Sequence, residues 1–188
     1  MKHVLFLMLL LQSIAGSAYA VAGDLSERLA GFAQINESAG DFVETWFANY
    51  LNEPLVSRGR LTYKKPGQLG KFIISPERIE QHIAGSRLSI KRHGEIRYIQ
   101  LSEKPELAAG VIALQAVLDG DEEKLHIFFK LQYKESQSGW KLSLVPKDKR
   151  LAKSIEQVVL QGQKYDIQQV RVLFLNGNKL LTEITHGN

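Results

Sequence analysis

The sequence contains no cysteine, so no disulfide can stabilise it. A folded domain must therefore depend on its hydrophobic core, and 188 residues are enough to build one. Beyond the first twenty residues, the sequence also lacks any apolar run approaching the ~20 residues that a membrane-spanning helix needs. We therefore expect a soluble domain that is held together by its core alone.

Recognisable catalytic motifs are also missing. The sequence has no H-E-x-x-H, G-x-S-x-G or G-x-x-x-x-G-K-[ST] pattern. Residues 67–71 resemble a phosphate-binding loop with the wrong spacing, and the acidic residues 119–123 are more typical of helix caps than of a calcium loop. Four histidines follow residue 20 and stand singly: His82, His93, His126 and His186. This pattern predicts a protein that is not an enzyme and needs no metal or cofactor, although a catalytic group assembled from distant residues stays open as an alternative.

The first twenty residues have the features of a secretory signal peptide. Lys2 supplies a positive start, residues 4–11 are apolar, and residues 18–20 (Ala-Tyr-Ala) form a small-x-small cleavage site. Cleavage would leave residues 21–188 as a single domain. Because no cysteine follows the cleavage site, the mature protein is not expected to be a lipoprotein itself.

The charge balance is only mildly basic, with 24 Lys and Arg residues against 20 Asp and Glu residues. Basic clusters occur at residues 64–65, 91–92 and 147–150. Since an exported protein does not meet nucleic acid, these clusters indicate a solvated face or a docking surface.

Most of the domain predicts antiparallel strands. In residues 52–75, "NEPLVSRGRLTYKKPGQLGKFIIS", apolar side chains occupy alternate positions on both sides of a Lys-Lys-Pro-Gly corner, as in a half-buried strand. Short turns at residues 85–86, 93–94 and 176–177 indicate hairpins. We expect about eleven strands, at residues 42–51, 55–64, 71–75, 79–84, 87–92, 95–101, 127–133, 140–144, 155–160, 167–175 and 179–185.

Two longer segments predict helices. Residues 25–32 place apolar side chains at helical spacing, and residues 107–118 carry a stripe of four apolar side chains. Gln115 is the only polar residue of the second segment, so that helix must contact apolar groups on more than one side. A short further helix is expected at residues 121–125, which begin with acidic side chains.

So many consecutive antiparallel strands must twist and curl. The sequence therefore predicts an α+β fold, a curved, half-open antiparallel β-barrel with an N-terminal helix and a central helical lid over an apolar cavity. A heavy load of aromatic residues with few covering helices supports such a container. An ordinary filled core is the alternative.

The order of these elements resembles the LolA-type periplasmic lipoprotein carriers. The similarity covers nearly the whole mature chain and includes F-x-E at residues 42–44 and "EPLVSRGRLTYKKPG" at residues 53–67. Three departures stand out: Lys65 replaces the usual Arg before proline, Leu69 and Lys71 stand where aromatics are common, and the sequence stops directly after its last strand.

Two segments, "PLVSRG" and "PKDKRLAKSIEQVVLQG", look closest to the LolA-related proteins associated with aryl polyene lipid assembly. The resemblance implies a periplasmic carrier, a monomer, that binds acyl chains of lipoproteins or related lipids. It also implies an inner-membrane donor complex, an outer-membrane acceptor and transient membrane proximity, with no nucleic acid as a partner.

The resemblance further assigns an acyl-chain site between the sheet and the lid, with Lys65 at the contact to the lid. The residues expected to line the site are apolar or aromatic. They are Phe42, Trp46, Leu61, Tyr63, Leu69, Phe72, Ile74, Leu88, Ile90, Leu107, Val111, Leu114, Leu118, Phe129, Leu131, Trp140 and Leu142.

Two other functions stay open. The same cavity would suit a carrier or sensor of a non-protein lipid of the aryl polyene type. A lipid-modifying enzyme is a weaker alternative, because it would need a cluster of polar groups inside the cavity.

Overall fold

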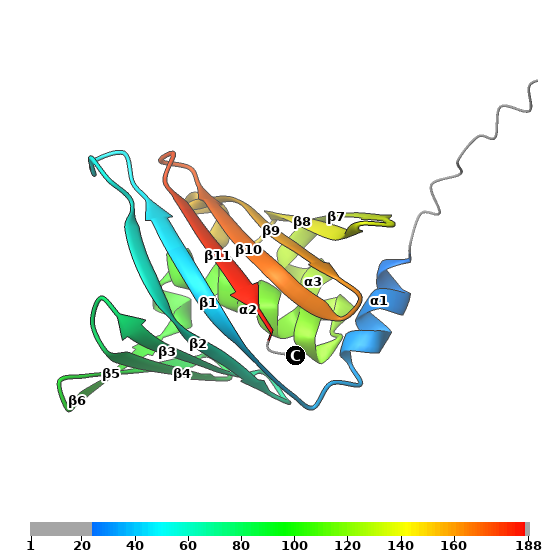
Figure 1. The fold of residues 1–188 in the computed structure, drawn as a ribbon. Helices are drawn as coiled ribbons and strands as arrows, with labels where there is room; N and C mark the ends of the chain where they lie inside the picture. Colours follow the sequence, from blue (N-terminus) through cyan, green and yellow to red (C-terminus); the bar gives the residue numbers. More distant parts are fainter. Residues whose placement is uncertain (1–23, 187–188) are drawn as a thin grey trace, which may run out of the picture.

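A computed structural model describes residues 24–186, which form one large, curved antiparallel sheet with three α-helices (Figure 1). The predicted signal peptide lies outside the described residues. The first six strands are β1 (Glu37–Phe47), β2 (Leu55–Lys64), β3 (Gln68–Ser75), β4 (Ile79–Ala84), β5 (Arg87–Arg92) and β6 (Glu95–Gln100). The last five are β7 (Phe129–Ser136), β8 (Gly139–Pro146), β9 (Ile155–Gln163), β10 (Asp166–Phe174) and β11 (Lys179–Thr185).

The strand order places the two ends of the domain at the centre of the sheet. The order is β6-β5-β4-β3-β2-β1-β11-β10-β9-β8-β7, so the first and last strands pair with each other. Strands β6 and β7 are the two edges, and they do not pair with each other. The sheet is therefore curved but unclosed, and the predicted α+β half-barrel of eleven strands is confirmed.

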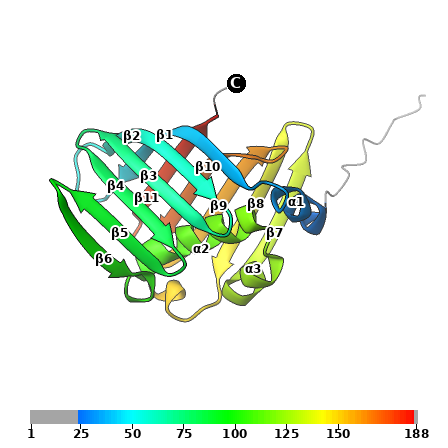
Figure 2. The ribbon, with the colours of Figure 1, turned by 90° about the horizontal axis from the view of Figure 1, so that it is seen from below.

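The helices cover the concave face of this sheet (Figures 1 and 2). They are α1 (Leu25–Phe32), α2 (Pro105–Asp119) and α3 (Glu122–Phe128), and two short 3-10 turns lie at Leu101–Glu103 and Leu151–Lys153. Figure 2 shows α2 running across the sheet between the two edge regions. One sheet face is thereby shielded from water and the other is left to solvent.

The residues at the two ends of α2 are types that favour helix termini. Pro105 occupies its first position, where a missing N–H costs no hydrogen bond. Gly120 follows its last residue with φ of 71°, and a Cβ there would lie 2.6 Å from the Leu29 carbonyl oxygen. Glycine is therefore required for the left-handed conformation and also for the close approach of α1.

The apolar character of α2 is explained by its neighbours. The helix packs against α1, α3 and strands β9 and β10, and the small side chains on this side are fully buried. Ala109, Ala113 and Ala116 each have no exposed surface, so the backbone of α2 approaches the rest of the core closely. The expectation that this helix contacts apolar groups on more than one side is confirmed.

Several predicted boundaries were wrong. The first strand was expected to begin at residue 42, but residues 37–41 also belong to β1 because each pairs with a residue of β2, from Lys64 back to Arg60. Strand β3 starts at Gln68, three residues earlier than predicted, for the same reason. Ile127 was assigned to a strand but lies in α3. At the starts of β1 and β3, pairing with a neighbouring strand overrides local propensity.

Candidate functional site

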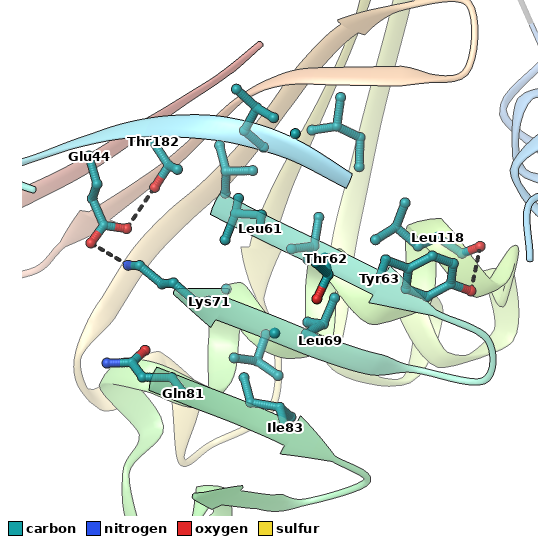
Figure 3. A pocket seen from close by; sticks show the side chains of 18 of the residues that line it. Glu44, Leu61, Thr62, Tyr63, Leu69, Lys71, Gln81, Ile83, Leu118 and Thr182 are labelled. Atoms are coloured by element: carbon teal, nitrogen blue, oxygen red, sulfur yellow. Dashed lines mark hydrogen bonds and ion pairs between the residues drawn. The ribbon is translucent and has the colours of Figure 1, made fainter. Parts of the chain in front are cut away.

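The concave face holds an apolar cavity of about 230 Å³ that is partly open to solvent (Figure 3). Its walls come from β1–β5, β10, β11 and α2. Strands β6 to β9 contribute no lining residue, so the cavity is formed by seven of the eleven strands, which are contiguous from β5 to β10 in the sheet.

The α2 stripe predicted from helical spacing faces this cavity. Leu107, Val111, Leu114 and Leu118 all line it, and Gly110 lines it between them. Leu107 is 43% exposed, whereas Leu118 at the other end of the helix is 8% exposed. The stripe therefore runs from solvent into the interior, while the opposite side of α2 packs against the core.

On the sheet side, four of the predicted residues line the cavity: Leu61, Tyr63, Leu69 and Leu88. The sequence interpretation missed the contribution of β4, β10 and β11. These strands supply Ile83, Ile167, Val170, Val172, Leu180 and Ile184. Alternation within β10 and β11 could have identified most of them, because residues two apart share one face of a strand.

The placement of Phe72 and Ile74 was wrong. Leu61 pairs with Lys71, and Tyr63 pairs with Leu69, so odd-numbered residues of this part of β3 face inward with them. Phe72 instead contacts His82 on the outer face, with ring centroids 5.1 Å apart, and Ile74 is 61% exposed. Neither side chain lines the cavity.

Four further residues that were expected to line the cavity belong to a filled part of the core. Phe129, Trp140 and Leu142 are at most 4% exposed, and Leu131 packs against the same cluster. Trp140 meets Phe32 of α1 edge-to-face, with centroids 5.7 Å apart. Because α3 packs on β7 and α1 contacts Trp140 of β8, these inward side chains are covered by protein and line no part of the cavity.

Phe42, Trp46 and Ile90 likewise do not line the cavity. Phe42 is 2% exposed and lies under the Lys71 ammonium, whereas Trp46 packs edge-to-face on Phe174. Ile90 is half-buried against the core. The even-numbered residues of β1 pair with inward-facing residues of β2, which fixes the phase that the sequence left open.

The Lys-Lys-Pro-Gly corner is hydrogen-bonded to the C-terminal end of α2. The Tyr63 hydroxyl donates to Asp119 Oδ1 at 2.7 Å and lies 3.1 Å from the Leu118 carbonyl oxygen. The Gly67 N–H donates to the same Asp119 oxygen at 2.9 Å, and Gln115 Nε2 donates to the Gly67 carbonyl at 2.6 Å. Burial and the hydrogen bond to Asp119 raise the pKa of Tyr63 well above its ordinary value, so the hydroxyl stays neutral.

Lys65 makes a different contact from the one expected. Its ammonium donates to the carbonyl oxygen of Ala33 at 2.5 Å, and Ala33 caps the C-terminal end of α1. The Lys65 N–H also donates to the carbonyl of Asn36, just after α1, at 2.8 Å. The end of β2 lies beside α1, so the Lys65 side chain is hydrogen-bonded to α1. Tyr63 and Gly67 are hydrogen-bonded to α2 instead.

One polar cluster interrupts the apolar lining of the cavity. The Lys71 ammonium donates to Glu44 Oε1 at 2.5 Å, and the Thr182 hydroxyl donates to Glu44 Oε2 at 2.9 Å. Figure 3 shows this cluster at one end of the drawn site and Tyr63 at the other. The sequence interpretation gave none of these three residues a role in binding.

Within residues 24–186, no group of three potential metal-ligating side chains lies together. No helix in that part of the chain is long and apolar enough to cross a membrane. The lining of the cavity is mostly apolar, and the Lys71–Glu44 ion pair is accompanied by a few further polar side chains, among them Gln81, Glu106 and His186.

Solved structures with a similar fold share little sequence with this chain. A LolA superfamily protein from Nitrosomonas europaea is 10% identical, with a TM-score of 0.49 over 86% of this chain and 90% of that one. A DUF1329 family protein from Desulfovibrio piger is 11% identical, with a TM-score of 0.46 over 86% and 88% of the two chains. The lipoprotein LppX of Mycobacterium tuberculosis is 9% identical, with a TM-score of 0.42 over 86% and 93%.

A search of curated proteins found no match. Comparison with family models matches residues 15–185, nearly the whole chain, to the family described as "Outer membrane lipoprotein carrier protein LolA-like". The curved unclosed sheet, the helices on its concave face and the apolar cavity agree with that assignment. The chain therefore belongs to the family of LolA-like outer membrane lipoprotein carrier proteins.

Proposed function

We propose that this protein is a soluble periplasmic carrier that holds an acyl chain in the cavity between α2 and strands β1–β5, β10 and β11. The observation that carries the proposal is the partly open apolar cavity, because a filled core would leave no room for cargo. The family match supports the same class of function.

Burial of an acyl chain is strong enough for carriage through water. Each buried methylene contributes ~0.8 kcal/mol, so a long chain gains on the order of 10 kcal/mol. Spontaneous release would then be slow, and a carrier must change shape beside an acceptor to release its cargo. Helix α2 is the element that we expect to move, because the exposed side chain of Leu107 shows that its stripe reaches solvent.

The predicted export signal and the family match support a direction of transport. We propose that cargo is received from a complex at the inner membrane and delivered to an acceptor at the outer membrane. The cargo class is either an acylated protein or a non-protein lipid of the aryl polyene type.

The first test is to purify the protein from a periplasmic fraction, extract it with organic solvent and analyse the extract by mass spectrometry. An acylated species at near-stoichiometric amount is expected, and its mass identifies the cargo class. A protein that yields no lipid and binds no fluorescent acyl probe would contradict the proposal.

A pair of matched variants locates the cargo. Leu114→Trp adds bulk inside the cavity, whereas Ile74→Trp adds the same ring on the exposed outer face. We expect the Leu114 variant to lose bound lipid and the Ile74 variant to keep it. Equal retention by two folded variants would place the cargo somewhere else.

A further inference from the structure

The ion pair in the cavity stands out because most of the lining around it is apolar. Lys71 and Glu44 expose only 22% and 16% of their side chains, and both line the cavity. Removing two charges from water is costly unless each is paired and hydrogen-bonded. An apolar pair at these positions would avoid that cost, so these charges call for an explanation in terms of the ligand.

Lys71 and Glu44 differ in how many of their hydrogen-bonding groups have partners. Both carboxylate oxygens of Glu44 are used, one by Lys71 and one by Thr182. The Lys71 ammonium carries three N–H donors. Among residues 24–186, one donor meets Glu44, and the ammonium lies 5.0 Å from the centroid of the Phe42 ring. This leaves N–H donors of Lys71 for a ligand, while each oxygen of Glu44 already accepts one hydrogen bond.

The charge of the pair decides which headgroup can use that donor. Glu44 neutralises Lys71 at 2.5 Å, and a second carboxylate, Glu106, also lines the cavity. A ligand carboxylate would meet repulsion from Glu44 in a partly desolvated site, where screening is weak. A neutral carbonyl accepts a hydrogen bond from Lys71 without that repulsion.

We propose that Lys71, held by Glu44 and Thr182, binds the neutral carbonyl of an esterified or amidated acyl chain and selects against the carboxylate of a free fatty acid. This inference rests on the proposed carrier function and specifies its ligand. Figure 3 shows Leu61, Leu69 and Ile83 between this cluster and Tyr63, so the acyl chain extends over them from the carbonyl.

The test compares headgroups on one chain length. Delipidated protein is titrated with lauric acid, methyl laurate and N-methyl lauramide in competition with a neutral fluorescent apolar probe, at about pH 8, where the acid is ionised. We expect the ester and the amide to bind about tenfold more tightly than the acid. Monolauroylglycerol and an N-lauroyl peptide are titrated in the same way, and the tighter of the two tells whether the carbonyl comes from a glycerolipid or an acylated polypeptide.

The decisive variant is Glu44→Gln, which keeps the shape and an acceptor for Lys71 but removes the negative charge. Lauric acid should then bind on the order of tenfold more tightly than to the wild type, while methyl laurate changes little. The control Glu80→Gln removes the same charge from an exposed pair with Lys91, at 3.5 Å, and should change neither ligand.

An unpaired Lys71 could lower the stability of that variant, so the double variant Glu44→Gln, Lys71→Met is measured alongside it. It carries no charge and no ammonium donor at this position, so methyl laurate should lose about tenfold in affinity. Circular dichroism confirms that each variant is folded.

The outcomes separate the two proposals. Equal binding of acid and ester, with the ratio unchanged in Glu44→Gln, would overturn the headgroup site and leave the carrier function standing. Failure of every probe to bind would overturn the carrier function, and the headgroup site with it.

Discussion

The contact between Tyr63 and the end of α2 provides a direct test of how the cavity is held shut. Replacing Tyr63 with Phe removes the hydroxyl that donates to Asp119 at 2.7 Å and leaves the ring in place. Asp119 keeps the N–H of Gly67 at 2.9 Å, so one of its two hydrogen bonds on this oxygen is lost. A hydrogen bond to a charged acceptor contributes about 1.5–3 kcal/mol, and we expect the free energy of unfolding to fall by that amount.

The same loss has a kinetic consequence if α2 leaves this contact when cargo is released. The closed state alone is then destabilised, and release accelerates about tenfold for each 1.4 kcal/mol. We therefore expect release to be roughly 10- to 100-fold faster in Tyr63→Phe. Stopped-flow transfer of a fluorescent acyl ester to acceptor vesicles measures the rate. Amide hydrogen exchange along α2 reports opening independently, and urea denaturation gives the stability.

The control is Tyr50→Phe, because Tyr50 is 76% exposed and the same hydroxyl is lost without a buried partner. Its stability and release rate should match the wild type. If Tyr63→Phe loses stability but releases cargo at the wild-type rate, the contact persists in the open state and α2 does not detach there. Unchanged stability would refute the energetic role of the hydrogen bond itself.

Three further predictions follow from contacts described above. Gly110→Ala should raise the free energy of unfolding by about 0.5–1 kcal/mol in thermal denaturation, because the added Cβ lies at an ordinary 3.5 Å from Val172 and alanine favours the helix; a lower melting temperature would contradict this. Lys65→Ala should cost roughly 1–2 kcal/mol and increase amide exchange in α1, since its ammonium bonds Ala33, and Lys65→Arg should restore most of the loss; exchange confined to α2 would refute that placement. The raised pKa of Tyr63 means that its neutral hydroxyl stabilises the fold below the unfolded pKa of about 10, and that this stabilisation falls as the pH rises above that value. The difference in unfolding free energy between the wild type and Tyr63→Phe should therefore shrink between about pH 8 and about pH 11. A constant difference would argue against the raised pKa.

Periodicity alone predicted much of the fold and the whole of the α2 stripe. Leu107 and Leu118 lie at the two ends of a regular helix, so spacing fixes that they share a face. The strand count was also predictable, because hairpin turns such as Asn176-Gly177 separate short alternating segments. These features are local, and local sequence is sufficient for them.

Local sequence could not predict which strands of the sheet line the cavity. Trp140 and Leu61 both face the concave side, yet the first is covered by α1 and the second borders open space. The difference depends on where a helix distant in sequence comes to rest. The prediction that Phe72 faces the cavity was wrong, because the pairing of Leu61 with Lys71 turns Phe72 to the outer face. An aromatic side chain inside a carrier was the simpler assumption.

The ion pair of the cavity was hidden for a related reason. Glu44 and Lys71 are 27 residues apart and on different strands, and only the assembled sheet brings them together. In the sequence, Glu44 stands out only as part of F-x-E, and Lys71 only as a position where aromatics are common. Strand β2 lies between the two strands, so the role of either charge can be assigned only when the arrangement of all three strands is known.

The position of α2 in the chain constrains how the barrel can deform. The chain leaves the sheet at one edge, β6, and returns at the opposite edge, β7, and the segment between them contains α2 and α3. A helix of 15 residues is about 22 Å long and resists stretching. Helix α2 is therefore a rigid connection between the two edge strands, β6 and β7. The half-barrel cannot widen at its edges without a movement of this helix.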